Sequence, residues 1–237
     1  MATFQVGFLV FPSITQLDLT GPFEVFSRMP GAAIHLIAPT REPVVADSGL
    51  TLSPTTTYAE CPRLDLICVP GGPGVLPLLN DSAALEFLVA QSAHVRYITS
   101  VCTGSMVLGA AGLLVGKRAT CHWMSRDFLE QFGAIPETAR VVRDGNVITG
   151  GGVTAGIDFA LTVVAEVADE ATAQRIQLMI EYDPAPPFAG GTPATSPNEV
   201  VNAVRDGAQE RQAERARGVA TARDALVRAG RLSAERS

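Results

Sequence analysis

One cysteine of this chain lies where a catalytic nucleophile is expected. Cys102 follows a short apolar segment, residues 97–101, and precedes the small residues Thr103-Gly-Ser105, after which apolar residues continue with helical spacing. This order predicts a strand, a tight turn and a helix, with the sulfur beside the first free N–H groups of the helix. Those groups and the positive end of the helix dipole favour a thiolate over a thiol. Cys102 is therefore the candidate nucleophile.

Asp18 is the candidate proton carrier. It lies in Gln16-Leu-Asp-Leu-Thr-Gly-Pro22, after the predicted first strand and just ahead of a predicted helix. Such a carboxyl group can simply cap the helix or bind loop amides, and spacing alone favours that role. The loop after a first parallel strand, however, opens on the sheet edge where ligands bind, as Cys102 does. A carboxyl group that faces a thiolate in a dry pocket has a raised proton affinity and can carry protons.

The three histidines, His35, His94 and His122, are weaker candidates. The position directly after the cysteine is Thr103, so no imidazole adjoins the nucleophile in the chain. His122, beside Trp123, is the only plausible imidazole, and the pattern gives it less weight than Asp18. A cysteine–histidine protease pairing is therefore disfavoured.

Backbone N–H groups are candidates for stabilising negative charge in a reaction. The N–H groups of Gly72, in Pro70-Gly-Gly-Pro-Gly74, and of Thr103 are expected to point at one small site. The segment Gly150-Gly-Gly-Val-Thr-Ala-Gly156, which includes Gly151, is interpreted as the backbone wall of a small pocket. A nucleotide-binding loop is rejected because the segment follows a hairpin and lacks the Lys-Ser/Thr of a P-loop.

The elements that position these residues alternate between strands and helices, which predicts a parallel sheet with helices on both faces. Strands are expected at residues 4–11, 33–38, 64–69, 97–101 and 118–122. Asp144-Gly145 predicts a hairpin over residues 141–148. Helices are expected from residue 20, with Pro22 near the first turn, and over 82–93 (capped by Asp81), 103–114, 125–132, 154–168, 170–182 and from 197 onward.

The domain organisation follows from a break in this pattern. The proline-rich segment Pro184-Ala-Pro-Pro-Phe188 interrupts regular structure. We therefore expect an α/β domain over residues 1–190 and a C-terminal helical extension over 191–237 that packs on the body or on a dimer partner.

Composition limits the partners and the compartment. The 237 residues carry a net charge of −6, which argues against nucleic acid or an anionic membrane surface. The arginines of the extension alternate with acidic residues, as on a solvated helix. No apolar run would span a bilayer and the first residues lack the basic region of a signal peptide, so a cytoplasmic location is predicted. The cysteines lack zinc-site spacing, and Cys61, Cys68 and Cys121 are expected to be reduced and structural.

The combined motifs resemble the PfpI/ThiJ superfamily of cysteine-elbow proteins over nearly the full length of the chain. Its branch that hydrates isocyanides is the most similar. The resemblance rests on Leu17-Asp-Leu-Thr-Gly-Pro22, Val69-Pro-Gly-Gly72, Ser100-Val-Cys-Thr-Gly-Ser105, His122-Trp123, the segment 150–160 and Pro184-Ala-Pro-Pro-Phe188.

This resemblance implies a flavodoxin-like parallel sheet with a nucleophile elbow, a homodimer, no cofactor and no metal. It implies that Cys102 is the nucleophile, Asp18 the acid/base, and Thr103 a hydrogen-bonding neighbour. The implied activity is hydration of a small neutral isocyanide to an N-substituted formamide through a thioimidate on the cysteine. Since that substrate is neutral, no cluster of basic recognition residues is expected.

Two other functions fit parts of the pattern. A cysteine that oxidises readily could serve as an oxidative-stress sensor without turnover, in which case Asp18 would not matter. A transcriptional regulator is the second alternative. It is disfavoured because the few residues after the proline-rich loop lack a recognisable turn between two DNA-reading helices.

Overall fold

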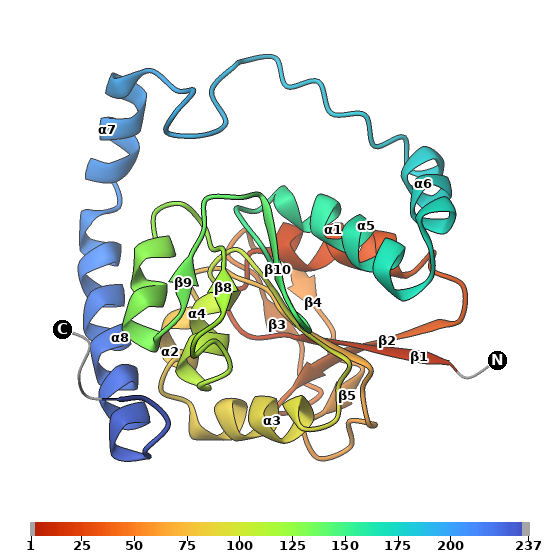
Figure 1. The fold of residues 1–237 in the computed structure, drawn as a ribbon, viewed down its shortest axis with the longest axis horizontal. Helices are drawn as coiled ribbons and strands as arrows, with labels where there is room; N and C mark the ends of the chain where they lie inside the picture. Colours follow the sequence, from red (N-terminus) through yellow and green to blue (C-terminus); the bar gives the residue numbers. More distant parts are fainter. Residues whose placement is uncertain (1–2, 234–237) are drawn as a thin grey trace.

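The centre of the molecule is a seven-stranded sheet in the order β10-β11-β7-β6-β1-β2-β5 (Figure 1). The computed structural model describes residues 3–233. The strands are β1 (Phe4–Leu9), β2 (Ala32–Ala38), β5 (Thr56–Thr57), β6 (Leu66–Val69), β7 (Tyr97–Val101), β10 (Val141–Asp144) and β11 (Val147–Gly150). All neighbours pair in parallel except β10 and β11, which form the predicted hairpin. The predicted flavodoxin-like α/β fold is confirmed.

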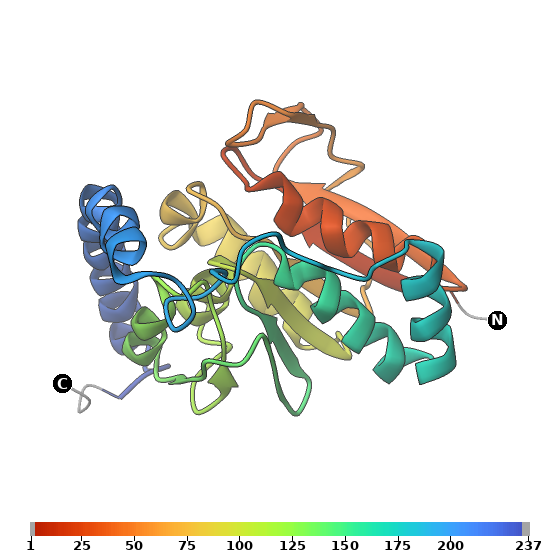
Figure 2. The same cartoon turned by 90° about the horizontal axis from the view of Figure 1, so that it is seen from above.

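Helices cover both faces of this sheet, as Figures 1 and 2 show. One face carries α1 (Gln16–Phe26) and α5 (Ala155–Val167), which pack on each other, with α6 (Glu170–Met179) against α5. The other face carries α2 (Val75–Leu78), α3 (Ser82–Ser92) and α4 (Gly104–Ala110). Because both faces are covered, every residue of β6, β7 and β11 is buried, which is typical of a parallel sheet.

The C-terminal helices lie along one side of the body. They are α7 (Asn198–Asp206) and α8 (Gln209–Arg228), and a long segment without helix or strand joins them to α6 (Figure 1). Helix α8 contacts α2, α4 and the 3-10 helix η1 (Arg126–Phe132). Its buried residues are Val219, Ala222 and Leu226. Helix α8 thus packs on the body. Within the described part, no helix is long and apolar enough to cross a membrane.

Several element boundaries differ from the prediction. Helix α1 begins at Gln16 rather than at residue 20, and Pro22 lies inside it. Helix α4 ends at Ala110 rather than residue 114, and Gly112 follows with a φ of 75° that is incompatible with continued helix. The predicted helix 125–132 is the 3-10 helix η1.

Short strands were the hardest elements to predict. The sequence pattern did not indicate the hairpin of β3 (Val44–Val45) and β4 (Thr51–Leu52), nor β5 and β9 (Ile135–Pro136). The strand expected at 118–122 is limited to β8 (Arg118–Ala119), which pairs with β9. Two residues are too few to show the alternation that identifies a strand.

The close contact of α4 with β6 generates a stability prediction. A Cβ on Gly104 would lie 1.9 Å from the carbonyl oxygen of Val69 and 2.7 Å from that of Pro70. Gly104→Ala must therefore push α4 away from the sheet. Such overpacking costs about 1–3 kcal/mol, which lowers the Tm of a protein of this size by about 2–10 °C.

Differential scanning calorimetry checks this prediction, with Gly207→Ala as the matched control. A Cβ on Gly207 would meet no atom closer than 3.5 Å, so this variant should keep the wild-type Tm. Equal Tm values for the two variants would contradict the tight packing of α4 on β6.

Candidate active site

Cys102 occupies a strained turn between β7 and α4. Its φ is 57°, in the left-handed region that residues other than glycine rarely adopt. Its N–H donates to the carbonyl oxygens of Gly151 at 2.8 Å and Gly150 at 3.1 Å, which fixes the turn to the end of β11. A nucleophile on a strained strand-to-helix turn is the elbow that the sequence predicted.

Asp18 lies in the first turn of α1 with its side chain fully buried. Its Oδ2 accepts a hydrogen bond from the N–H of Gly71 at 2.9 Å. Its Oδ1 is buried and, within residues 3–233, has no hydrogen-bond partner. The N-cap position of the helix is Thr15, so Asp18 is not there to cap it. A buried carboxyl oxygen without a partner is costly and indicates a functional group.

Gly71 allows the elbow and α1 to approach each other. A Cβ at this position would lie 2.6 Å from the backbone nitrogen of Thr103 and 2.7 Å from Asp18 Oδ2. Any larger residue would separate the carboxyl group from the nucleophile turn. The sequence analysis named the neighbouring Gly72 instead, since glycines in one turn are indistinguishable by pattern.

Burial controls the ionisation of the pair formed by Asp18 and Cys102. The pKa of Asp18 is raised to about 7, chiefly by burial and to a lesser extent by the nearby Asp47, while interactions with Cys102 and Gly71 oppose the shift. Burial and the charge of Asp18 also raise the pKa of Cys102 well above its usual value, although the N–H of Thr103 lowers it. The pair therefore holds two protons below about pH 7 and a single proton, on sulfur, above it.

The raised pKa of Cys102 favours a resting thiol over the thiolate that the helix end was expected to stabilise. Helix α4 has seven residues, and its dipole acts on the sulfur of a residue that is only 5% exposed. Desolvation and the facing carboxyl group outweigh the stabilisation that the helix end provides.

The backbone groups proposed as charge-stabilising donors have different roles. The N–H of Gly72 donates to Thr103 Oγ1 at 3.0 Å, so it positions Thr103 and is not free to bind a reacting atom. The N–H of Gly151 donates to the carbonyl of Arg140 at 2.9 Å, while its own carbonyl accepts from Cys102. Among the three predicted residues, Thr103 keeps its N–H directed at the sulfur of Cys102.

Buried hydroxyl groups fasten the elbow to its surroundings. Ser105 Oγ donates to the carbonyl of Thr120 at 2.7 Å and lies 2.8 Å from Ser100 Oγ. The N–H of Thr120 donates to Thr149 Oγ1 at 2.8 Å. This network joins β7, α4, β11 and the segment after β8. Sequence analysis did not identify it, because single hydroxyl residues in strands and turns form no pattern.

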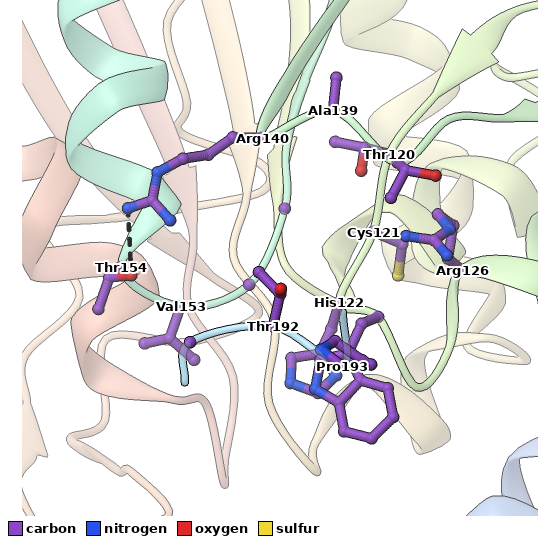
Figure 3. A pocket seen from close by; sticks show the side chains of 15 residues that line it. Thr120, Cys121, His122, Arg126, Ala139, Arg140, Val153, Thr154, Thr192 and Pro193 are labelled. Carbon is purple, nitrogen blue, oxygen red and sulfur yellow. Dashed lines mark hydrogen bonds between the residues drawn. The ribbon is translucent and has the colours of Figure 1, made fainter. Parts of the chain in front are cut away.

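A cavity of about 320 Å³ lies beside the elbow (Figure 3). Four segments line it: residues 120–126 in part, 138–140, 151–154 and 191–193. Gly151 is common to the cavity and to the elbow, since its carbonyl holds the N–H of Cys102. Cys102 and Asp18 are not among the residues that line the cavity.

His122 and Cys121 both lie in the cavity wall, although the sequence indicated a possible catalytic role for His122 alone. His122 lines the cavity, and burial together with Arg215 lowers its pKa, so the ring is neutral. Its Nδ1 accepts from the N–H of Met124 at 3.3 Å, which places the ring hydrogen on Nε2. Cys121, expected to be merely structural, also lines the cavity, and burial raises its pKa to about 12.

Two arginines of the cavity wall, Arg126 and Arg140, were not predicted. They come from separate segments, and no spacing in the sequence indicates that they meet. Arg140 Nε lies 2.6 Å from Asp158 Oδ2, which also accepts from the hydroxyl of Tyr182 at 2.9 Å. Within residues 3–233, no group of three or more His, Cys, Asp or Glu side chains is arranged to hold a metal ion.

Comparison with known proteins gives close relatives over most of the chain. The isonitrile hydratase of Pseudomonas putida is 57% identical over 201 residues, 85% of this chain and 88% of the relative. A crystal structure of a THiJ/PfpI family protein from Pseudomonas syringae has a TM-score of 0.90 and 47% identity, covering 92% of this chain and 91% of that one.

A more distant relative is a longer protein, of which only a part matches this chain. The HTH-type transcriptional regulator GbdR of Pseudomonas aeruginosa is 28% identical over 76% of this chain, but the match spans only 51% of the regulator. The model of the DJ-1/PfpI family matches residues 5–166. The elbow, the fold and these matches agree: the chain belongs to the DJ-1/PfpI family.

Proposed function

We propose that this protein is an isocyanide hydratase, a hydro-lyase that adds water to R–N≡C and releases an N-substituted formamide. The observation that carries this proposal is the buried pair of Asp18 and Cys102, with a carboxyl pKa near 7 and an unpartnered carboxyl oxygen. The 57% identity to an isonitrile hydratase supports the choice of substrate.

In the first half of the reaction the isocyanide carbon receives both a nucleophile and a proton. The sulfur of Cys102 attacks the terminal carbon while the carboxylate of Asp18 takes the thiol proton and delivers it to that carbon. One S–C bond and one C–H bond form, and one N–C π bond breaks. The product is the thioimidate R–N=CH–S on the enzyme, which divides a difficult addition into two steps.

In the second half water adds to the thioimidate carbon. Asp18 takes a proton from the water as its oxygen attacks and delivers this proton to the nitrogen, which gives R–NH–CH(OH)–S and restores the carboxylate. Collapse of this adduct breaks the C–S bond, and the hydroxyl proton returns through Asp18 to the sulfur. Formamide leaves and the pair regains its single proton.

Neighbouring residues assist without entering the covalent steps. The N–H of Thr103 stabilises the sulfur when it departs as a thiolate, as its effect on the pKa of Cys102 indicates. Gly72 holds the hydroxyl of Thr103, and Gly151 holds the N–H of Cys102. The cavity beside Gly151 offers space for the R group, with Trp123 and Val153 in its wall.

The alternative functions find less support. A redox sensor needs an exposed thiolate, whereas Cys102 is 5% exposed with a raised pKa. The match to the transcriptional regulator covers only 51% of that protein. The homodimer, the cytoplasmic location and the lack of a nucleic-acid or membrane partner stay predictions.

Cys102→Ala and Asp18→Asn should each abolish formamide production from cyclohexyl isocyanide. The first variant lacks the nucleophile and the second lacks the base, and losing either group of a coupled unit costs at least about 10³-fold in kcat. Gas chromatography of the formamide measures the rates. Cys61→Ser and Asp183→Asn, which change the same residue types outside the site, should retain wild-type activity. Wild-type turnover by Asp18→Asn would contradict the mechanism.

The pH dependence of activity follows from the single shared proton. Below a pH of about 7 Asp18 is protonated, the pair holds two protons and no base is present. The kcat/KM should therefore rise as the pH increases through about 7. It should fall only when the raised pKa of Cys102 is passed on the alkaline side. A profile that is flat from pH 5 to 9 would show that Asp18 does not act as the base.

A further inference from the structure

The cavity beside the elbow is positively charged, although the protein carries a net charge of −6. Its wall includes Arg126 and Arg140, and no aspartate or glutamate among the described residues lines it. The isocyano group is neutral and gives no reason for a guanidinium group without a partner there. Such a group would bind another part of the ligand.

The two arginines differ in their partners. Arg140 is ion-paired with Asp158 at 2.6 Å and also donates to the hydroxyl of Thr154 at 3.2 Å (Figure 3). Arg126 is half-buried, and within residues 3–233 its side chain makes no hydrogen bond and no ion pair. Its guanidinium keeps five N–H donors without an acceptor in a confined space.

The surroundings of Arg126 supply no anion to satisfy it. Figure 3 shows its side chain beside Cys121, which is a thiol, with Thr120 on the same wall. The adjacent Asp127 is exposed and borders a different hollow. The nearby Arg215 on α8, whose Nη1 bonds Ser125 Oγ at 3.1 Å, adds further positive charge.

We propose that Arg126 binds an anionic group, a carboxylate, on the substituent of the isocyanide. Preferred substrates are then isocyanides that carry a carboxylate away from the isocyano carbon. A guanidinium binds a carboxylate through two parallel hydrogen bonds, so this recognition is directional as well as electrostatic. The inference rests on the proposed hydratase function and names its substrate class.

A matched pair of probes tests this inference. Para-isocyanobenzoate and para-isocyanobenzamide have nearly the same shape, but only the first is charged. Wild type should show a kcat/KM about 10-fold higher for the benzoate. Arg126→Gln should remove this preference by raising KM for the benzoate, with the amide unchanged. Arg126→Lys, which keeps the charge but loses the paired geometry, should lie between them.

Arg63→Gln is the control for charge alone. Arg63 is exposed and precedes β6, so it lies toward the amino ends of the strands, away from the elbow. This variant removes one positive charge and should keep the wild-type preference. Equal kcat/KM values for the two probes in wild type would overturn the inference, as would an equal loss for both probes in Arg126→Gln. Either result would leave the hydratase function standing.

Failure of the proposed function would be recognised separately. If wild type converts neither probe nor cyclohexyl isocyanide, the hydratase assignment fails. Calorimetric binding of para-formamidobenzoate to wild type and Arg126→Gln then decides the anion site. Binding that weakens about 10-fold in the variant supports a carboxylate site at Arg126, and equal or absent binding overturns it.

Discussion

The burial of one carboxyl group, that of Asp18, is the constraint on which the site depends. The unfolded chain releases its proton near pH 4, whereas the folded chain retains it to about pH 7. The stability present below pH 4 is therefore lost progressively as the pH rises to about 7. This loss is on the order of 4 kcal/mol, since each pKa unit corresponds to about 1.4 kcal/mol. A fold keeps such a group only where it serves the chemistry, here beside Cys102.

The backbone around Asp18 is built to hold it close to the sulfur. Gly71 leaves room for the carboxyl group and donates its N–H to Oδ2, and Gly104 lets α4 begin directly against β6. Cys102 adopts its strained φ because the carbonyl of Gly151 fixes its N–H. These contacts join elements that are far apart in the sequence. Their joint effect is a rigid pair of groups that exchange one proton.

The parts of this arrangement that depend on local pattern could be predicted from the sequence. The strand before Cys102, the turn after it, and the Asp144-Gly145 hairpin each have a local signature. The start of α1 at Gln16 was missed because Pro22 suggested a later first turn. The protonation of Cys102 and the convergence of Arg126 and Arg140 depend on burial and long-range packing. Neither property is encoded in residue spacing, so only the structure shows them.

The most direct test of the account is the ionisation of Asp18 itself. Protein labelled with carbon-13 at the aspartate side-chain carboxyl groups can be titrated by NMR, with Asp18→Asn used to assign the signal. The account predicts a midpoint at about pH 7 for Asp18. A midpoint near pH 4, as for an exposed aspartate, would contradict it, because the base would then already be ionised at pH 5 and the predicted rise of activity near pH 7 would have no cause.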